Sequence, residues 1–292
     1  MPELPEVETI RRDLVKSILG KKIRKVEILS AKTVSPGPRK FLSRLTGQSF
    51  VAIDRLGKLL IFSLSDQKHF LLIHLKMTGQ LIYSGHNKLV VGGHSLKATS
   101  LSGYIGGELP NKSTRVYFTF FDGSKLFFND QRRFGYLKTV TANDLAKIKL
   151  KYGIEPLTAN FTLKNFFKVI ASRTKNIKAL LLDQSLISGL GNIYADEALF
   201  AAGIRPSRRA DSLTRGEIER LYGVIEALIR KAIKYRGTTF NNYRDAQGKK
   251  GNFVGKLQVY GRDKEQCLKC GRSIKKIKIA GRGTHYCPHC QK

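Results

Sequence analysis

The chain begins MPELPEVETI, with a proline at position 2 and glutamates at positions 3, 6 and 8. A small residue at position 2 usually permits removal of the initiator methionine, which leaves Pro2 with a free secondary amine. An α-amino group has a pKa of about 7.7 to 8.0, so much of it is an unprotonated nucleophile near neutral pH. The alternative interpretation is helix initiation, because proline and acidic side chains favour the first turn of a helix.

All four cysteines lie near the C-terminus, as the pairs Cys267-Leu-Lys-Cys270 and Cys287-Pro-His-Cys290. Two such pairs are typical of a closed zinc site with four thiolate ligands, so we expect one structural Zn²⁺ ion. The alternative is a set of disulfides or a redox pair, which we disfavour because we expect no signal peptide. The nearby His285 and His289 could replace a ligand, but four cysteines already complete the shell.

The Gly-x-Gly segment before Asn192 contains residues suited to binding a polyanion. Gly189 and Gly191 precede a predicted helix that begins near Asn192, where backbone N–H groups and the asparagine side chain can bind a phosphate. The alternative for this Gly-x-Gly segment is a simple tight turn.

The segment QRRFG joins the guanidinium of Arg132 to the aromatic ring of Phe134, a combination suited to insertion into a base stack. The alternative is a solvated arginine pair beside a core phenylalanine. Met77, in KMTGQ, is either core filler or part of such a wedge. Lys58, in RLGKLLIF, is either a surface lysine at the end of a strand or a cation held in a cleft.

Two patterns of secondary structure must position these residues. An N-terminal helix is predicted by apolar residues at three- and four-residue spacing up to Gly20, and strands are predicted from Lys22 to about Val140. Asp122-Gly123 predicts a type I′ hairpin turn. The glycine-rich residues 84–111 predict a long loop or an irregular insertion.

From about Thr158 the spacing of apolar residues changes from that of strands to that of helices, and four segments are predicted to be helical. The longest is predicted to be capped by Ser212 and to end at Gly237. Its apolar stripe comprises Ile218, Leu221, Ile225, Leu228 and Ala232.

The charge of the chain indicates its partner. With 53 Lys+Arg against 22 Asp+Glu the net charge is +31, which favours binding to nucleic acid. We find no apolar run long enough to span a bilayer.

Taken together, MPELPEVET, GKLL, HLKMTG, QRRFG, LLDQSLISGLGNIYADEALF, LQVYGR and the four-cysteine finger resemble, in this order, bacterial formamidopyrimidine-DNA glycosylase. The resemblance covers nearly the whole chain. It implies a bifunctional glycosylase and abasic-site lyase that excises oxidised purines from double-stranded DNA in base excision repair. It also implies a monomer in the bacterial cytoplasm, associated with the nucleoid.

The resemblance implies a role for each candidate residue. The amine of Pro2 is the nucleophile on C1′ of the damaged nucleotide, Glu3 a proton donor, and Lys58 a proton donor for β-elimination. Arg262, in LQVYGR, contacts a phosphate and supports δ-elimination. The void left by the flipped base is filled by Met77, Arg132 and Phe134. The DNA backbone is contacted by Arg173, Lys178 and Asn192.

The sequence departs from the family pattern at two places. Ser113 stands where the family usually carries a DNA-contacting histidine, so we expect that contact to be weakened or lost. Residues 84–111 are longer than usual, and they either lengthen a hairpin or contact DNA through Lys88 and Lys97.

We therefore expect an α+β fold in four parts. These are an N-terminal β-sandwich catalytic domain with a flanking helix (1–140), a linker (141–157), a helical helix-two-turn-helix domain (158–240) and a C-terminal zinc finger region (241–292). Two other functions remain open at this point. One is excision of oxidised pyrimidines, as by endonuclease VIII, and the other is DNA binding by a zinc-finger protein without catalysis.

Overall fold

The computed structural model describes residues 1–86, 88–93, 105–238 and 253–292. The chain divides into two compact units, one comprising residues 1–150 and 235–254 and the other residues 151–234 and 255–292. The expected division into four parts stays a prediction. Among the described residues, no helix is long and apolar enough to cross a membrane.

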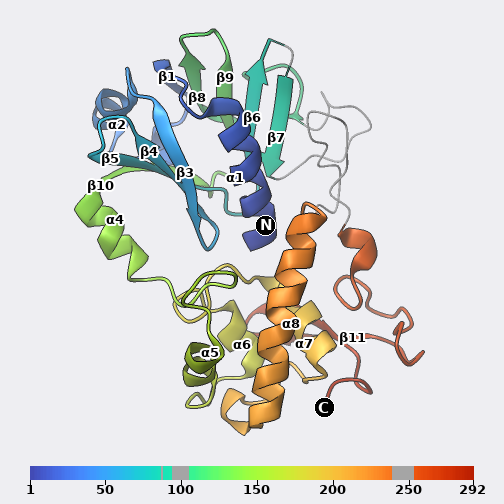
Figure 1. The fold of residues 1–292 in the computed structure, drawn as a ribbon. Coiled ribbons are helices and arrows are strands. Elements are labelled where there is room, and N and C mark those ends of the chain that lie inside the picture. The colour runs from blue at the N-terminus through green and yellow to red at the C-terminus, as the bar shows by residue number, and fades with distance from the viewer. Residues whose placement is uncertain (87, 94–104, 239–252) are drawn as a thin grey trace. The chain divides into compact units, whose positions relative to one another are not determined.

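Two five-stranded sheets form the first unit (Figure 1). Across the first sheet the strands are β1 (Ile23–Ile28), β8 (Thr114–Phe120), β9 (Lys125–Asp130), β6 (Gly79–Gly85) and β7 (Lys88–Gly93). Across the second they are β2 (Val34–Ser35), β10 (Tyr136–Thr141), β5 (His69–His74), β4 (Leu59–Leu64) and β3 (Phe50–Leu56). Every pairing is antiparallel except that of β10 with β2.

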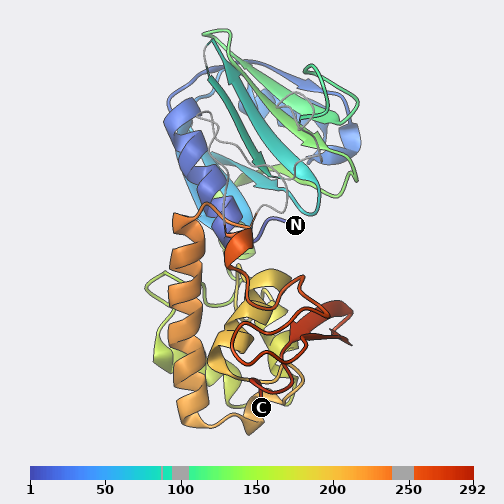
Figure 2. The same cartoon turned by 90° about the vertical axis from the view of Figure 1, so that its right-hand side faces the viewer.

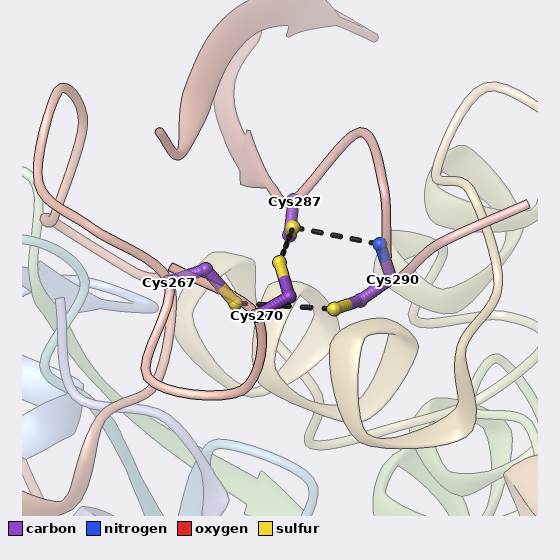
Figure 3. Close-up of side chains that lie close together, drawn as sticks. All are labelled: Cys267, Cys270, Cys287 and Cys290. Carbon is purple, nitrogen blue, oxygen red and sulfur yellow. Dashed lines mark hydrogen bonds between the residues drawn. The ribbon is translucent and has the colours of Figure 1, made fainter. Parts of the chain in front are cut away.

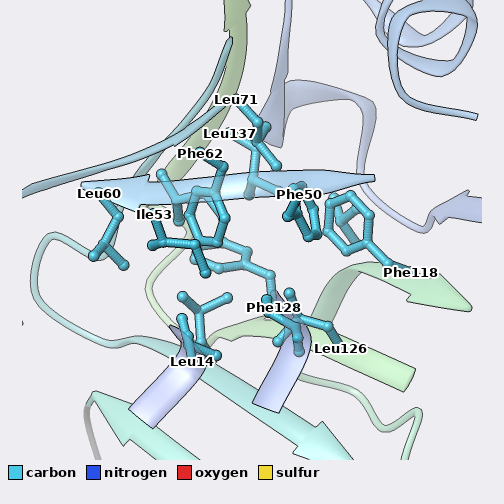
Figure 4. Close-up of a cluster of buried hydrophobic side chains, with 14 of the residues drawn as sticks. Leu14, Phe50, Ile53, Leu60, Phe62, Leu71, Phe118, Leu126, Phe128 and Leu137 are labelled. Atoms are coloured by element: carbon cyan, nitrogen blue, oxygen red, sulfur yellow. The ribbon is translucent and has the colours of Figure 1, made fainter. Parts of the chain in front are cut away.

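An apolar core lies between the two sheets (Figure 4). Phe50 and Phe62 of the second sheet pack against Phe118 and Phe128 of the first, which confirms the predicted β-sandwich with its flanking helix. Alternation in β8 buries Val116, Phe118 and Phe120, as the sequence predicts.

Helix α1 (Leu4–Ile18) covers the side of the sandwich where β3 and β7 form the sheet edges. Its predicted apolar face is buried, and Ile10 lies directly against the backbone of β7. A Cβ at Gly92 would come within 2.6 Å of Ile10 Cγ1, so glycine permits this close approach. Helix α2 (Pro38–Leu45) contacts β1, β2 and β10, and α4 (Ala142–Lys149) follows β10.

Two predictions in this unit need correction. The β8–β9 turn is not type I′, because Gly123 has a positive φ but Asp122 does not. The Gly123 N–H donates to the Phe120 carbonyl at 3.1 Å, giving a wider loop in which only the glycine is left-handed. Residues 84–111 are also not one loop, since Lys88 begins β7, which pairs with β6. Lys97 lies outside the described residues.

The second unit contains α5 (Leu163–Ile170), α6 (Ile177–Leu182), α7 (Asn192–Ala202), α8 (Arg215–Lys234) and the hairpin of β11 (Lys275–Ile279) with β12 (Arg282–Tyr286) (Figure 2). The Thr214 hydroxyl accepts from the Glu217 N–H, and the Glu217 carboxylate accepts from the Thr214 N–H. This capping box shows that the predicted cap at Ser212 is wrong. Ile229, and not Leu228, occupies the buried stripe of α8.

Candidate functional site

The N-terminal segment places Pro2 and Glu3 immediately before α1. Pro2 is buried, and the Glu3 side chain accepts from the Glu6 N–H as part of a capping box. The Glu6 carboxylate accepts from the Glu3 N–H at 2.9 Å and from the Thr238 N–H at 2.6 Å. Glu3 is only 3% exposed, so its carboxylate is held beside Pro2 by the start of the helix.

Lys58 lies in the turn between β3 and β4. It is 6% exposed, which makes the surface-lysine interpretation wrong. His74 is the last residue of β5. Its pKa is lowered to about 3 by burial and by the charges of Lys76 and Lys58. The Lys76 N–H donates to His74 Nδ1 at 3.0 Å. Lys58 is therefore a buried cation beside a neutral imidazole.

Met77, Arg132 and Phe134 come together from two turns of the sandwich. Arg132 Nη1 lies 3.5 Å from Met77 Sδ, and the Arg132 guanidinium carbon lies 4.9 Å from the centroid of the Phe134 ring. Phe134 is 54% exposed, so its interpretation as a core residue is wrong. The three side chains form a partly apolar, cationic cluster, which we call the wedge.

Asp130 fixes the two turns that carry the wedge. Its Oδ2 accepts from the Gly135 N–H at 2.7 Å, and its Oδ1 accepts from the hydroxyl of Thr78. The Thr78 oxygen in turn accepts from the Arg132 N–H at 2.9 Å. A Cβ at Gly135 would lie 2.7 Å from the Phe128 ring, so glycine is required for this approach. The wedge is thus attached to a buried carboxylate.

The Gly-x-Gly segment ends at the start of α7, as predicted. Gly191 is the N-cap residue and offers no side chain to the first N–H groups of the helix. Those groups are suited to binding an anion. The Asn192 side chain donates to the Gly283 carbonyl at 2.9 Å, so in this structure it joins the helix to the C-terminal hairpin.

Lys178 and Arg173 are less exposed to solvent than we expect of side chains that bind phosphate at a surface. Lys178 is fully buried, with Nζ 2.6 Å from Asp196 Oδ1 and 2.7 Å from Thr284 Oγ1. The half-buried Arg173 donates to the Val169 carbonyl of α5 at 2.8 Å. The structure therefore gives Lys178 a bracing role between α6, α7 and the C-terminal hairpin, while its phosphate contact stays a prediction.

The four cysteines converge on one point (Figure 3). Their Sγ atoms all lie within 4.8 Å of one another, with Cys270 and Cys287 3.5 Å apart and Cys267 and Cys290 4.0 Å apart. A tetrahedral shell with Zn–S bonds of about 2.3 Å requires sulfur separations of about 3.8 Å. The cysteines are free rather than disulfide-bonded, so they form one structural zinc site that fits the ion.

Arg262 precedes this site in the loop that leads to Cys267. Its guanidinium donates to the Gln258 carbonyl at 2.9 Å and to the Gln266 carbonyl at 3.1 Å, and its Nε donates to Glu265 at 2.8 Å. The side chain is 17% exposed. It is therefore oriented by its own loop and stays partly exposed.

Ser113 lies at the end of the long β7–β8 connection and is 9% exposed. Its N–H donates to Asn111 Oδ1 at 2.9 Å, and its carbonyl accepts from the Asp130 N–H at 2.8 Å. It belongs to the backbone framework that holds Asp130. Its effect on DNA contact stays a prediction.

Sequence reasoning singled out neither His74 nor Asp130. His74 lies within the HLKMTG motif and Asp130 directly precedes QRRFG, so proximity to a motif was the available signal. Their partners were not visible, because the bonded groups of Asp130 include Thr78, 52 residues away.

Three family models match the chain in sequence order. They are the formamidopyrimidine-DNA glycosylase N-terminal domain over residues 1–137, the formamidopyrimidine-DNA glycosylase H2TH domain over 152–244, and the zinc finger found in FPG and IleRS over 264–292. They account for most of the chain.

Curated relatives and solved structures agree with these models. The formamidopyrimidine-DNA glycosylases of Symbiobacterium thermophilum and Pelotomaculum thermopropionicum are 42% and 41% identical over all of this chain, covering 89% and 99% of those proteins. A Lactococcus lactis FPG mutant in complex with a Fapy-dG containing DNA has a TM-score of 0.85 at 36% identity, with both chains fully covered.

The Lactococcus lactis Fpg in complex with an abasic site containing DNA has a TM-score of 0.84 at 36% identity, covering 99% of each chain. Sequence identity over the full length and the same fold together identify the family. This chain belongs to the formamidopyrimidine-DNA glycosylase family.

Proposed function

We propose that this chain is a bifunctional DNA glycosylase and abasic-site lyase that excises oxidised purines, including 8-oxoguanine and formamidopyrimidines, from duplex DNA in base excision repair. Membership of the family supports the proposal, as do solved Lactococcus lactis relatives bound to Fapy-dG DNA and to abasic DNA. The observation that carries it is Pro2 directly before the buried carboxylate of Glu3.

The chemistry begins at the amine of Pro2 once Met1 has been removed. The nitrogen attacks C1′, Glu3 supplies a proton as the sugar ring opens, and the damaged base departs with the electrons of the glycosidic bond. A secondary amine gives an iminium ion that cannot lose a proton from nitrogen. This cation stays electrophilic and promotes loss of a proton from C2′.

Two eliminations then cut the strand. In β-elimination the C2′ proton is lost and the C3′–O bond breaks, with Lys58 acting as the proton donor. In δ-elimination the C4′ proton is lost and the C5′–O bond breaks, with Arg262 contacting the departing phosphate. The burial of Lys58 and the partial exposure of Arg262 suit these roles.

Binding requires that the damaged nucleotide leave the base stack. We assign the wedge of Met77, Arg132 and Phe134 to the vacated space, because extrusion removes stacking worth a few kcal/mol. Arg173, Lys178 and Asn192 serve the DNA backbone, directly or by holding the segments that contact it. The zinc site holds the basic finger hairpin. We further propose a monomer that acts in the bacterial cytoplasm at the nucleoid.

Borohydride trapping on duplex DNA containing 8-oxoguanine opposite cytosine tests the proposal. We expect a covalent complex whose crosslink maps to Pro2 by mass spectrometry. Pro2→Gly should abolish most trapping and strand cleavage but keep DNA binding, and Pro5→Ala is the matched control within the same segment. Neither a zinc-finger binding protein nor an enzyme restricted to oxidised pyrimidines would give the 8-oxoguanine adduct. A crosslink to a lysine, or full activity with Met1 retained, would contradict the mechanism.

A further inference from the structure

The Glu197 side chain, on α7, accepts three consecutive backbone N–H groups. Oε2 accepts from Gln258 at 2.9 Å, and Oε1 accepts from Val259 at 2.9 Å and from Tyr260 at 2.8 Å. Glu197 is 3% exposed. None of the roles proposed above uses this carboxylate.

The three N–H groups belong to the loop that carries Arg262. Gln258 is bonded at both ends of this arrangement, because its N–H meets Glu197 while its carbonyl accepts from Arg262 Nη1 at 2.9 Å. Gly261 has a φ of +77°, which turns the chain back toward Gln258. A displacement of residues 258–260 therefore displaces the guanidinium.

The same loop is attached to α7 by apolar packing. Phe200, one helical turn after Glu197, packs in a cluster with Val259 and with Cys267 and Cys287 of the zinc site. This cluster fixes the distance between loop and helix, whereas the directional bonds to Glu197 fix the orientation of the backbone.

Burying the Glu197 carboxylate costs free energy, which its hydrogen bonds must offset. Burial raises the pKa of this carboxyl, and the nearby Asp196 acts in the same direction, while the N–H groups of Tyr260, Val259 and Gln258 lower it. An apolar side chain at this position would avoid the burial of a charge. A glutamine would present an N–H₂ donor to one of the three N–H groups, so only a carboxylate accepts all three.

We propose that Glu197 is a positioning residue for Arg262, which orients the guanidinium for δ-elimination by holding the backbone of residues 258–260. The inference rests on the proposed function, because it concerns the assigned role of Arg262. In that step the C4′ proton is lost and the C5′–O bonding electrons leave with the phosphate, whose charge the guanidinium stabilises.

Glu197→Gln tests the inference, with Glu219→Gln, an exposed glutamate of α8, as the matched control. We expect δ-elimination on an abasic duplex to slow by about 10- to 100-fold, since a displacement of about 1 Å can cost that much. β-Elimination and borohydride trapping should change by less than about threefold. The product of β-elimination that has not undergone δ-elimination should therefore accumulate. Zinc content should remain one per chain.

A double-mutant cycle separates positioning from a general structural role. Glu197→Gln should add little to the δ-elimination defect of Arg262→Ala, because both changes remove the same interaction. Independent, additive losses would overturn the proposal, as would an unchanged ratio of δ to β products in Glu197→Gln. If Glu197→Gln fails to fold or to retain zinc, Glu197→Asp replaces it, since the shorter carboxylate keeps the charge but should still lower the δ to β ratio.

The outcomes also distinguish this inference from the proposed function. Loss of Pro2 trapping in the unmodified protein would reject the enzyme mechanism itself. Normal trapping with an unaltered product ratio in Glu197→Gln and Glu197→Asp would reject only the positioning role.

Discussion

The substitution Phe134→Ala tests whether this ring acts in the wedge or stabilises the folded core. Removing a fully buried phenylalanine costs about 3 to 5 kcal/mol of stability. Because 54% of Phe134 is exposed, and an exposed cation–π contact such as that with Arg132 is worth about 0.5 to 1 kcal/mol, we expect Phe134→Ala to lower the free energy of unfolding by less than about 2 kcal/mol. The protein should remain folded at assay temperature.

Excision should respond more strongly than stability. If the ring replaces the stacking lost on base extrusion, its removal withdraws about 2 to 3 kcal/mol from the flipped state. At about 1.4 kcal/mol for each factor of ten, excision from an 8-oxoguanine duplex falls by about 30- to 150-fold. Cleavage at a preformed abasic site should fall by much less, because less stacking must be broken there.

Single-turnover cleavage of the two duplexes, together with a thermal unfolding curve, measures these effects. Phe121→Ala is the matched control. Phe121 belongs to the same unit, is 62% exposed and lies beneath Lys22 at 5.5 Å, but it is outside the wedge. Equal losses on the lesion and the abasic duplex would refute the void-filling role. A loss of stability above about 3 kcal/mol would contradict the assignment of Phe134 as an exposed side chain outside the core.

Three other perturbations follow from the structure. Cys290→Ser should release the zinc and abolish DNA binding, as measured by metal analysis and a binding assay; zinc-free protein with full activity would contradict this. Raising salt from about 50 to 200 mM should weaken DNA binding by about 10³- to 10⁵-fold if six or more phosphates are neutralised, whereas a flat response would count against electrostatic binding by this chain of net charge +31. Burial raises the pKa of Glu8, but hydrogen bonds from Arg11 and Arg12 outweigh it and lower the pKa from 4.5 to about 2. The ionised Glu8 carboxylate therefore stabilises the folded state above pH 4.5, and this contribution is lost as pH falls toward 2. Denaturant titrations across that range should show that the free energy of unfolding depends less on pH in Glu8→Gln than in the unmodified protein.

The sequence alone determined the features that depend on local order. The spacing of the four cysteines predicts the zinc site, because short loops bring paired thiolates together. The apolar period of residues 4–18 predicts α1, and the alternation at Val116, Phe118 and Phe120 predicts β8. These patterns are local because the repeats of helix and strand are themselves only two to four residues long. The family resemblance extended them to roles for Pro2 and Glu3.

The tertiary structure decided which residues far apart in the sequence form hydrogen bonds and ion pairs with one another. Sequence left Lys58 as either a surface or a cleft cation, and packing of the sheets buried it. It described Lys178 as a DNA contact, whereas the fold places Asp196 and Thr284 against its ammonium. Glu197 reads as an ordinary helical glutamate until the loop at 258–260 lies over it. A buried charge needs partners, and those partners come from segments that meet only when the chain has folded.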